Sequence, residues 1–260
     1  MKNNNKFRFD VWGAITLGTI ALYALFLLYP MAYLIRQSVL DPDTGGFTLA
    51  YFTKFFSKSY YFDTLINSFK VSITATVLSI AIGTPLAYLF TIFKIKGKSV
   101  LNILIVVASM SAPFIGAYSW ILLLGRSGVI TAFFKNLGIA IPDIYGFGGI
   151  VLVMTLQLFP LVFLYAKGAL KNIDNSLIEA AENLGCSGIA CFFKVVVPLI
   201  MPTLLAAALL VFMRSFADFG TPMLIGEGYR TFPVVLYTEF INEVGGSDGF
   251  AAAIAVIAIV

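Results

Sequence analysis

Long runs of apolar residues, separated by shorter polar segments, dominate the chain. Five of these runs contain no charged residue, and each approaches or exceeds the ~20 residues that an α-helix needs to cross the hydrocarbon core of a membrane. This pattern predicts five full membrane spans, at residues 11–35, 71–93, 99–125, 144–166 and 195–213.

A sixth apolar run begins at Gly249 and continues to Val260, which is about half a crossing. A helix that ended in the middle of the bilayer would leave its last carbonyl groups without hydrogen-bond partners. We therefore expect the natural chain to continue, and we predict an all-α membrane protein, a polytopic transmembrane helix bundle of about six spans.

The overall composition agrees with this prediction. Hydrophobic residues make up 60% of the chain and charged residues only 12%, against roughly 25% charged residues in ordinary soluble domains. Lys2, Lys6 and Arg8 precede the first apolar run, as they would in a secretory signal, but the run is too long and no cleavage site follows it. We therefore expect an uncleaved first helix.

The distribution of basic residues predicts a multi-pass protein with a cytoplasmic N-terminus. In this orientation the cytoplasmic segments have the higher density of Lys and Arg. The pI near 9.0 then reflects membrane topology, so we expect the lipid bilayer, and no nucleic acid, among the partners. The cytoplasmic basic residues are Lys2, Lys6, Arg8, Lys94, Lys96, Lys98, Lys167, Lys171 and Lys194.

Groups that could perform catalysis are scarce. The chain has no histidine, which is the commonest metal ligand and general base. The predicted third span contains serines, but no base is placed to activate them. We therefore expect no catalytic residue and no metal site. The spans also contain almost no ionisable groups, which argues against a proton- or sodium-coupled carrier.

Residues 172–198 predict two short helices around a glycine. Ser176 and Glu179 fit the S-x-x-E capping box that begins a helix. Gly185 is placed to end this helix in the left-handed conformation, and Ser187 is placed to cap the next one. The result is a helix-turn-helix, called here the elbow (residues 172–198), which the predicted topology puts on the cytoplasmic side.

The elbow carries an apolar stripe at helical spacing. Leu177, Ala181 and Leu184 form the stripe, and Ile178 and Ala180 lie next to it. From the residues alone, two interpretations remain open. The stripe either lies on the lipid interface or docks against another protein surface.

The same stretch resembles the EAA signature of the permeases of binding-protein-dependent ABC importers. The match consists of Glu179-Ala180-Ala181, then Gly185 after three further residues, then a valine run that ends in Pro198. Valines stand where isoleucine and leucine are commoner in the family. Shorter likenesses occur in the family's order at residues 83–88, 113–128 and 159–160, so the resemblance covers nearly the whole chain.

This resemblance implies that residues 1–260 form an ABC transporter permease domain of the bacterial inner membrane. The implied partners are a pair of ABC ATPase subunits, an extracytoplasmic solute-binding protein and a second permease half. ATP and Mg would be used by the ATPase, so this chain would bind no cofactor and catalyse no reaction. The implied coupling residues are Ser176, Leu177, Glu179, Ala180, Ala181, Leu184, Gly185 and Pro198.

Residues 215–226 are similar to the A-D-F-G-x-P segment of the iron(III) importer permeases. That branch often fuses two permease halves in one polypeptide, so we expect this chain to be the N-terminal half of a longer fused permease. Ferric iron is the first choice of substrate. The alternatives are 2-aminoethylphosphonate, thiamine and polyamines, and, from another class of protein, a secondary carrier or channel.

Arg214 and Asp218 lie four residues apart at the outer end of the fifth predicted span. The simplest interpretation is a salt bridge between neighbouring turns at the membrane interface. The alternative hypothesis is that Asp218, together with Arg214, lines the external mouth of the transport pathway.

Overall fold

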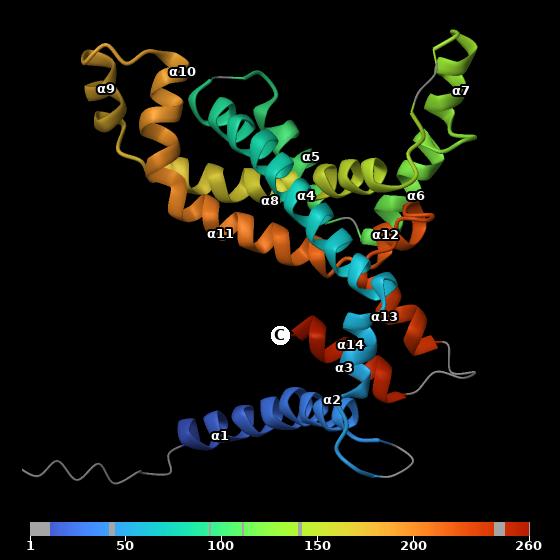
Figure 1. Cartoon of the computed structure of the whole chain (residues 1–260). Coiled ribbons are helices and arrows are strands. Elements are labelled where there is room, and N and C mark those ends of the chain that lie inside the picture. Colours follow the sequence, from blue (N-terminus) through green and yellow to red (C-terminus); the bar gives the residue numbers. More distant parts are fainter. Residues whose placement is uncertain are drawn as a thin grey trace, which may run out of the picture. The chain divides into compact units, whose positions relative to one another are not determined.

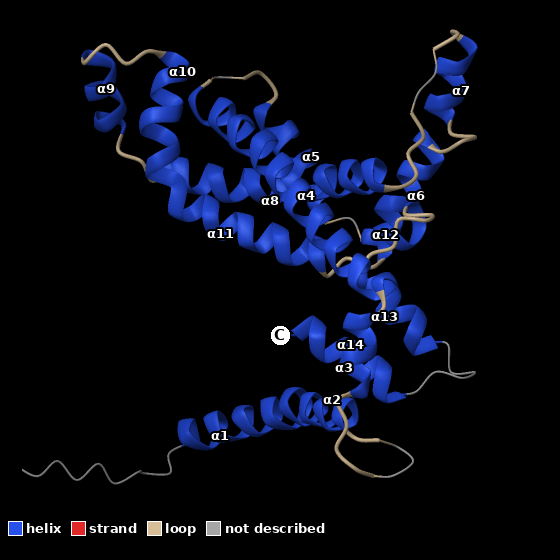
Figure 2. Cartoon of the chain, in the orientation of Figure 1, coloured by secondary structure: helices blue, strands red, loops and turns tan. Residues whose placement is uncertain are grey.

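The computed structural model describes residues 11–41, 45–93, 95–110, 112–139, 142–241 and 248–259. The regular secondary structure of these ranges is helical, apart from one isolated bridge between Leu40 and Phe47, and turns and loops connect the helices (Figure 2). The chain divides into two compact units, and each is described by itself. The first unit contains residues 1–62 and 236–260, and the second contains residues 63–235.

Within the described residues, five helical segments are long and apolar enough to cross a membrane, which agrees with the five predicted spans in number. They are Val11–Val39, Ser59–Ile92, Phe114–Asn136, Phe147–Lys171 and Gly188–Phe216. Three shorter apolar helices accompany them, at Lys98–Ser109, Phe232–Ile241 and Gly249–Ile259. The chain is therefore a polytopic helical membrane protein.

In the first unit, α2 (Tyr29–Val39) packs against α14 (Asp248–Ile259), and α3 (Ala50–Ser57) packs against the same helix. An aromatic cluster holds this packing together. The ring of Tyr61 lies 5.0 Å from that of Phe250 and 5.9 Å from that of Phe55. The Tyr61 hydroxyl donates a hydrogen bond to Glu239 Oε1 at 3.2 Å.

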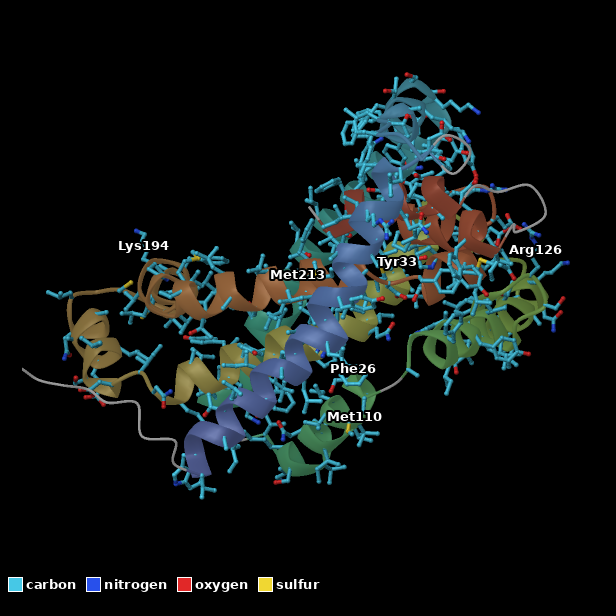
Figure 3. All side chains as sticks on the ribbon, turned by 90° about the horizontal axis from the view of Figure 1, so that it is seen from below. Phe26, Tyr33, Met110, Arg126, Lys194 and Met213 are labelled. Carbon is cyan, nitrogen blue, oxygen red and sulfur yellow. The ribbon has the colours of Figure 1, made fainter. Side chains whose placement is uncertain are left out.

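Helix α1 (Val11–Tyr23) contributes no buried residue. The large apolar side chains of this helix and of its continuation are exposed, as Phe26 is in Figure 3. A helix that is apolar on every face in a membrane protein is suited to contact with lipid or with other helices.

A π-helical turn precedes Pro30 and another precedes Pro198. These turns are η1 (Ala24–Leu28) and η2 (Phe192–Val196). A proline has no backbone N–H, and its ring clashes with the carbonyl one turn earlier. The wider π turn accommodates this defect: the N–H of Tyr29 bonds the Ala24 carbonyl and that of Val197 bonds the Phe192 carbonyl, each five residues back.

The prediction of one continuous third span, residues 99–125, is wrong. The structure has α5 (Lys98–Ser109) and α6 (Pro113–Leu124), with a break between them. Pro113 is the cause, because a proline disfavours helical backbone at the preceding residue. Ala112 is extended, with ψ of 142°, and Pro113 occupies the first position of α6. After a turn at residues 125–128, α7 (Val129–Asn136) follows.

The core of the second unit is formed by α8 (Phe147–Lys171), packed against α11 (Val197–Phe216). Helix α4 (Ser59–Ile92) crosses α8 (Figure 1). The buried face of α4 includes a row of small residues at helical spacing, which permits a close approach. These residues are Ser68, Ser72, Ala75, Ser79, Gly83 and Ala87.

Two short helices, α12 (Gly220–Ile225) and α13 (Phe232–Ile241), follow α11. Helix α12 packs on α6 and α8, and the N–H of Phe232 donates to Ser68 Oγ at 2.8 Å. Short apolar helices of this kind lack the ~20-residue uncharged run by which spans are recognised in sequence.

Gly83 is predicted to be essential for the packing of α4 on α8. A Cβ atom at this position would lie 2.9 Å from the Phe159 carbonyl oxygen and 2.9 Å from Val162 Cβ. Gly83→Ala should therefore destabilise the protein by about 1–3 kcal/mol, measured as thermal unfolding in detergent. Gly168→Ala in α8 is the matched control, because its Cβ would meet nothing within 4 Å. Equal melting temperatures for the two variants would contradict this account.

Candidate functional site

The elbow begins with α9 (Asn175–Asn183), and Asp174 caps this helix. The backbone N–H of Ser176 donates to Asp174 Oδ1 at 3.0 Å, and that of Leu177 donates to the Asp174 carbonyl at 3.1 Å. The predicted capping box of Ser176 and Glu179 is therefore wrong in position. Ser176 lies inside the first turn, where its own N–H donates to the Asp174 carboxylate, so Asp174 occupies the cap position instead.

Gly185 ends α9 as predicted. Its φ is +86°, the left-handed region that favours glycine. The N–H of Cys186 bonds the Ala181 carbonyl at 3.0 Å, and the N–H of Leu184 bonds the Ala180 carbonyl at 3.1 Å. The 6→1 hydrogen bond from Cys186, the residue after the left-handed glycine, to the carbonyl five residues back is the hallmark of a Schellman motif. The chain thus reverses sharply between the two halves of the elbow.

The second half begins at Ser187, the predicted cap residue of α10 (Gly188–Cys191). Its side chain makes no capping hydrogen bond there, and its carbonyl instead accepts from the N–H of Ala190 at 2.9 Å. The position of the second helix was therefore predicted correctly, but the capping interaction was not.

The turn of the elbow exposes large apolar side chains. Leu184 is 89% exposed, and Leu177 of the predicted stripe is 48% exposed. Ala181 is half-buried, and Ile178 packs on the core of the unit, so the stripe is only partly available. Ile189, which the prediction missed, is 79% exposed. It escaped notice because it lies beyond the glycine, on a separate helix.

The second half of the elbow is joined firmly to the bundle. The rings of Tyr88 on α4 and Phe192 lie 4.6 Å apart, and Cys191 and Val196 are buried. Pro198, another of the predicted coupling residues, is exposed in the first turn of α11. η2 continues directly into α11, so the elbow and that helix are joined without a break.

A cavity of about 450 Å³ lies among α5, α6, α8 and the segment between α11 and α12. We call it the central cavity. Both predicted pathway residues line it. The complete lining is Ser109, Phe114, Gln157, Leu158, Arg214, Ala217, Asp218, Phe219 and Gly220.

Asp218 does not form the predicted salt bridge with Arg214; the ion pairs of the described residues join other side chains. Asp218 instead caps α12. Its Oδ1 accepts from the N–H of Gly220 at 2.9 Å, and its Oδ2 accepts from the Thr221 hydroxyl at 2.6 Å. Burial raises the pKa of the Asp218 carboxyl, and these hydrogen bonds oppose the rise. The carboxylate is thus fixed at the edge of the central cavity.

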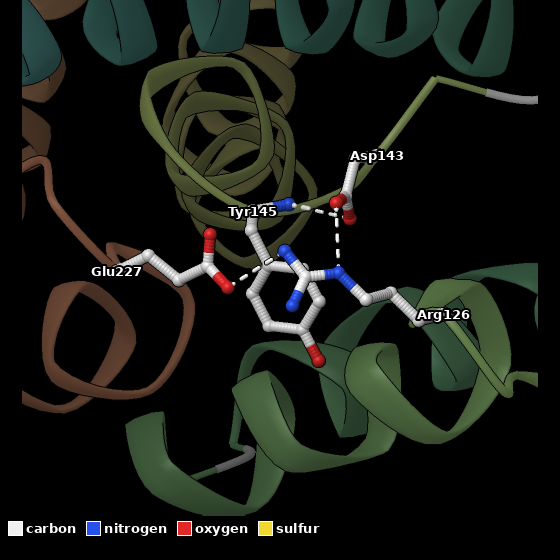
Figure 4. A network of polar contacts seen from close by, with 4 residues as sticks. All are labelled: Arg126, Asp143, Tyr145 and Glu227. Atoms are coloured by element: carbon white, nitrogen blue, oxygen red, sulfur yellow. Dashed lines mark hydrogen bonds and ion pairs between the residues drawn. The ribbon is translucent and has the colours of Figure 1, made fainter.

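A second polar cluster, which we call the Arg126 cluster, contains Arg126, Asp143, Tyr145 and Glu227 (Figure 4). Arg126 Nε lies 3.1 Å from Asp143 Oδ2, and a terminal nitrogen lies 2.8 Å from Glu227 Oε1. The guanidinium also lies 4.7 Å from the centre of the Tyr145 ring. These contacts tie together three loops that are far apart in the sequence, and Glu227 has a φ of +47°.

The elbow lies at one end of α8 (Figure 1), and the Arg126 cluster, which contains Asp143 and Tyr145, lies at the other. Lys171, the last residue of α8, leads into the elbow, whereas Tyr145 directly precedes the other end. A helix of 25 residues is ~37 Å long. The two polar regions are therefore separated by the thickness of a membrane core, with the central cavity between them.

This arrangement agrees with the result of a family comparison. Residues 46–260 match the model of the family described as "Binding-protein-dependent transport system inner membrane component". The chain belongs to this family. It is therefore a multi-pass permease component of an ABC importer, and the resemblance inferred from the elbow is confirmed.

Relatives with two different cargoes are similar to this permease. The ferric transport system permease protein FbpB of Actinobacillus pleuropneumoniae is 28% identical, over 95% of this chain and 35% of the relative. The spermidine/putrescine transport system permease protein PotB of Haemophilus influenzae is also 28% identical, over 96% of this chain and 89% of the relative. The chain thus spans only about a third of the ferric relative.

The fold is that of known importer permeases. A bacterial alginate ABC transporter, solved in complex with its alginate pentasaccharide-bound periplasmic protein, has a chain with a TM-score of 0.77 to this one. The two are 17% identical, and the alignment covers 95% of this chain and 90% of that chain. At this identity the likeness establishes the helical fold alone.

Asp174 gives the elbow a dependence on pH. Hydrogen bonds from the Ser176 backbone and side chain lower the pKa of the Asp174 carboxyl in the folded state. The cap is therefore fully formed above the ordinary pKa of aspartate, ~3.9, and is lost as pH falls through the lowered value. Asp174→Ala should speed amide exchange in the first turn of α9 roughly fivefold at neutral pH, measured by hydrogen–deuterium exchange.

Two variants serve as controls for this prediction. Asp174→Asn keeps an acceptor oxygen, so it should retain protection at neutral pH and lose the acid transition. Glu179→Ala should leave exchange unchanged, because this residue takes no part in the observed cap. If Glu179→Ala exposes the first turn as much as Asp174→Ala does, the original capping box would be correct.

Proposed function

We propose that this permease moves its cargo when a pair of ABC ATPase subunits binds the elbow. The observation that carries this proposal is the combination of an exposed apolar turn with a rigid connection to the bundle. Leu184 and Ile189 face outward, while Phe192 and Val196 of the same elbow are buried against the bundle. A surface of this kind fits an apolar groove on a partner protein better than it fits water.

In this mechanism, ATP and Mg bind to the ATPase subunits, and the permease itself makes and breaks no bond. Closure of the ATPase pair displaces the elbow, and η2 and α11 transmit the displacement to the central cavity. The helices then rock between states open to either side of the membrane. Arg214 lies in the last turn of this same helix and Asp218 follows its end, so the elbow and the cavity are mechanically connected.

The orientation proposed for the permease places the elbow in the cytoplasm and the Arg126 cluster outside. The density of basic residues supports this assignment. An extracytoplasmic solute-binding protein would then deliver cargo at the end of α8 that carries the Arg126 cluster. A second permease half, either another chain or a further part of a fused polypeptide, would complete the pathway.

Ferric iron is the cargo that we propose. The segment similar to iron(III) permeases, residues 215–226, contributes Ala217, Asp218, Phe219 and Gly220 to the lining of the central cavity. The FbpB relative, whose name states ferric transport, supports the same choice, and its greater length fits a fused permease. The described residues contain no group of three or more His, Cys, Asp or Glu side chains that could hold a metal.

Polyamines are the second candidate, because the PotB relative has the same identity and matches this chain over most of its own length. A secondary carrier or channel is the rival from another class. A carrier would transport its substrate in vesicles without an ATPase, whereas an ABC permease requires the ATPase and ATP. Uptake by vesicles that contain the permease alone would therefore overturn the proposal.

The elbow can be tested by substitutions at its exposed turn. Leu184→Asp places a charge on the apolar surface, so binding of the ABC ATPase should weaken roughly 30-fold or more, measured by co-purification and by ATP-dependent uptake. Gly185→Pro should have the same effect, since proline cannot adopt a φ of +86°. Ala181→Asp should also have it, because it places a charge in the apolar stripe of the elbow. Membrane insertion should be retained in all three variants.

The matched control for the elbow is Leu137→Asp. Leu137 is also an exposed leucine, but it follows α7 at the far end of α8, so ATPase binding should be normal. Normal assembly and uptake in Leu184→Asp would refute the assigned role of the elbow.

Asp218→Asn tests the proposed pathway. Asparagine retains an acceptor for the N–H groups of α12 but removes the charge, so we expect uptake to fall roughly tenfold, the effect of losing about 1.4 kcal/mol of interaction with the cargo, with little change in thermal stability. Asp63→Asn, at an exposed position of α4, is the control. Unchanged uptake in Asp218→Asn would show that the carboxylate takes no part in transport.

A further inference from the structure

A second polar cavity, of about 320 Å³, lies at the elbow end of α8, between the end of α4 and the beginning of α5. We call it the basic cavity. Its lining contains three lysines, a hydroxyl from each of two residues, one amide and one aromatic ring. These residues are Phe90, Thr91, Lys98, Ser99, Asn102, Lys167 and Lys171.

The charges of the basic cavity are all positive. The Lys167 ammonium donates a hydrogen bond to Asn102 Oδ1, which is a neutral partner. Lys98 and Lys171 interact electrostatically with Lys167, and no carboxylate lines the cavity. In the part of the chain that the structure describes, the ion pairs involve Arg126 and none of these three lysines.

The beginning of α5 adds to this positive potential. Lys98 is its first residue, and Gly97 before it has a φ of +78°. The N-terminal end of a helix carries a partial positive charge and N–H groups that favour an anion. Helix α5 has no acidic residue in its first turn and no side-chain cap, so this charge is not compensated within the helix.

Apolar side chains also lie around the basic cavity, some buried in the bundle and others exposed. Phe90 lines the cavity, and its ring packs edge-to-face on that of Phe163, with ring centres 5.2 Å apart and both residues buried. Next to the cavity, the apolar side chains of Phe93, directly after α4, and of Val100 and Leu104 on α5 are exposed. A group with an anionic head and apolar chains would satisfy both the lysines and these neighbours.

We propose that the basic cavity binds a phosphate group, supplied by the head group of an anionic phospholipid. Three ammonium groups around one cavity repel one another, and a phosphate diester or monoester offers each of them an acceptor oxygen. The cavity lies where three helices reach the end of their apolar sequence, the depth at which lipid phosphates are found. Basic cavities at this depth are suited to anionic head groups. The site is separate from the elbow turn and from the central cavity.

Lipid binding to the full-length permease can be measured by native mass spectrometry after exchange into detergent with phosphatidylglycerol, phosphatidylethanolamine or phosphatidylcholine. We expect phosphatidylglycerol to be retained best. The double variant Lys98→Gln/Lys171→Gln should weaken its binding roughly 30-fold, about fivefold for each lysine. The double variant Lys98→Arg/Lys171→Arg should retain binding, which separates loss of charge from loss of fold.

Lys194→Gln is the matched control. Lys194 belongs to the elbow, at the same end of α8, but does not line the basic cavity. Competition by millimolar inorganic phosphate, together with equal retention of the three lipids, would support a phosphate site that takes a soluble anion. Equal phosphatidylglycerol binding by the wild type and the double glutamine variant would overturn the proposal. An equal loss in Lys194→Gln would also overturn it.

Discussion

The close packing of α4 and α11 on α8 is the constraint on which the rest of the second unit depends. At Gly83 the backbone of α4 approaches that of α8 so closely that even a methyl group would collide with it. The large side chains of Phe163 and Val162 on α8 are fully buried. Lipid offers no hydrophobic driving force for helix association. The van der Waals energy of such contacts between small and large residues must therefore hold the helices together. These contacts also fix the positions of both cavities and of the elbow.

The sequence predicted the helical fold and the spans well, because long uncharged runs and their lengths are local properties. The left-handed Gly185 was also predictable, because a glycine at the end of a helix is a local signal. The break before Pro113 does not show in the hydrophobic run, which continues through it, whereas the proline itself signals that a helix kinks or ends there. Asp174 was passed over as a cap because a capping box of Ser176 and Glu179 fitted the pattern equally well, and only backbone geometry distinguishes the two.

The interactions that depend on tertiary structure could not be predicted. Asp218 was expected to pair with Arg214, four residues earlier, but the start of α12 offers it two backbone N–H groups and a hydroxyl. The Arg126 cluster joins residues 126, 143 and 227, and no local pattern relates positions so far apart. The basic cavity likewise brings Lys98 next to Lys167 and Lys171 only after α5 has folded against α8.

The π-helical turn before Pro198 has a consequence for how the elbow is aimed. A π turn holds one residue more than an α turn, so deletion of a single residue between Phe192 and Val196 would restore ordinary helix geometry at that point. Each residue of an α-helix advances the chain by about 100° around its axis. The shortened chain would therefore present the apolar turn at Leu184 in a different direction relative to α11. The direction in which the turn of the elbow faces, relative to α11, thus depends on the one extra residue of this π turn.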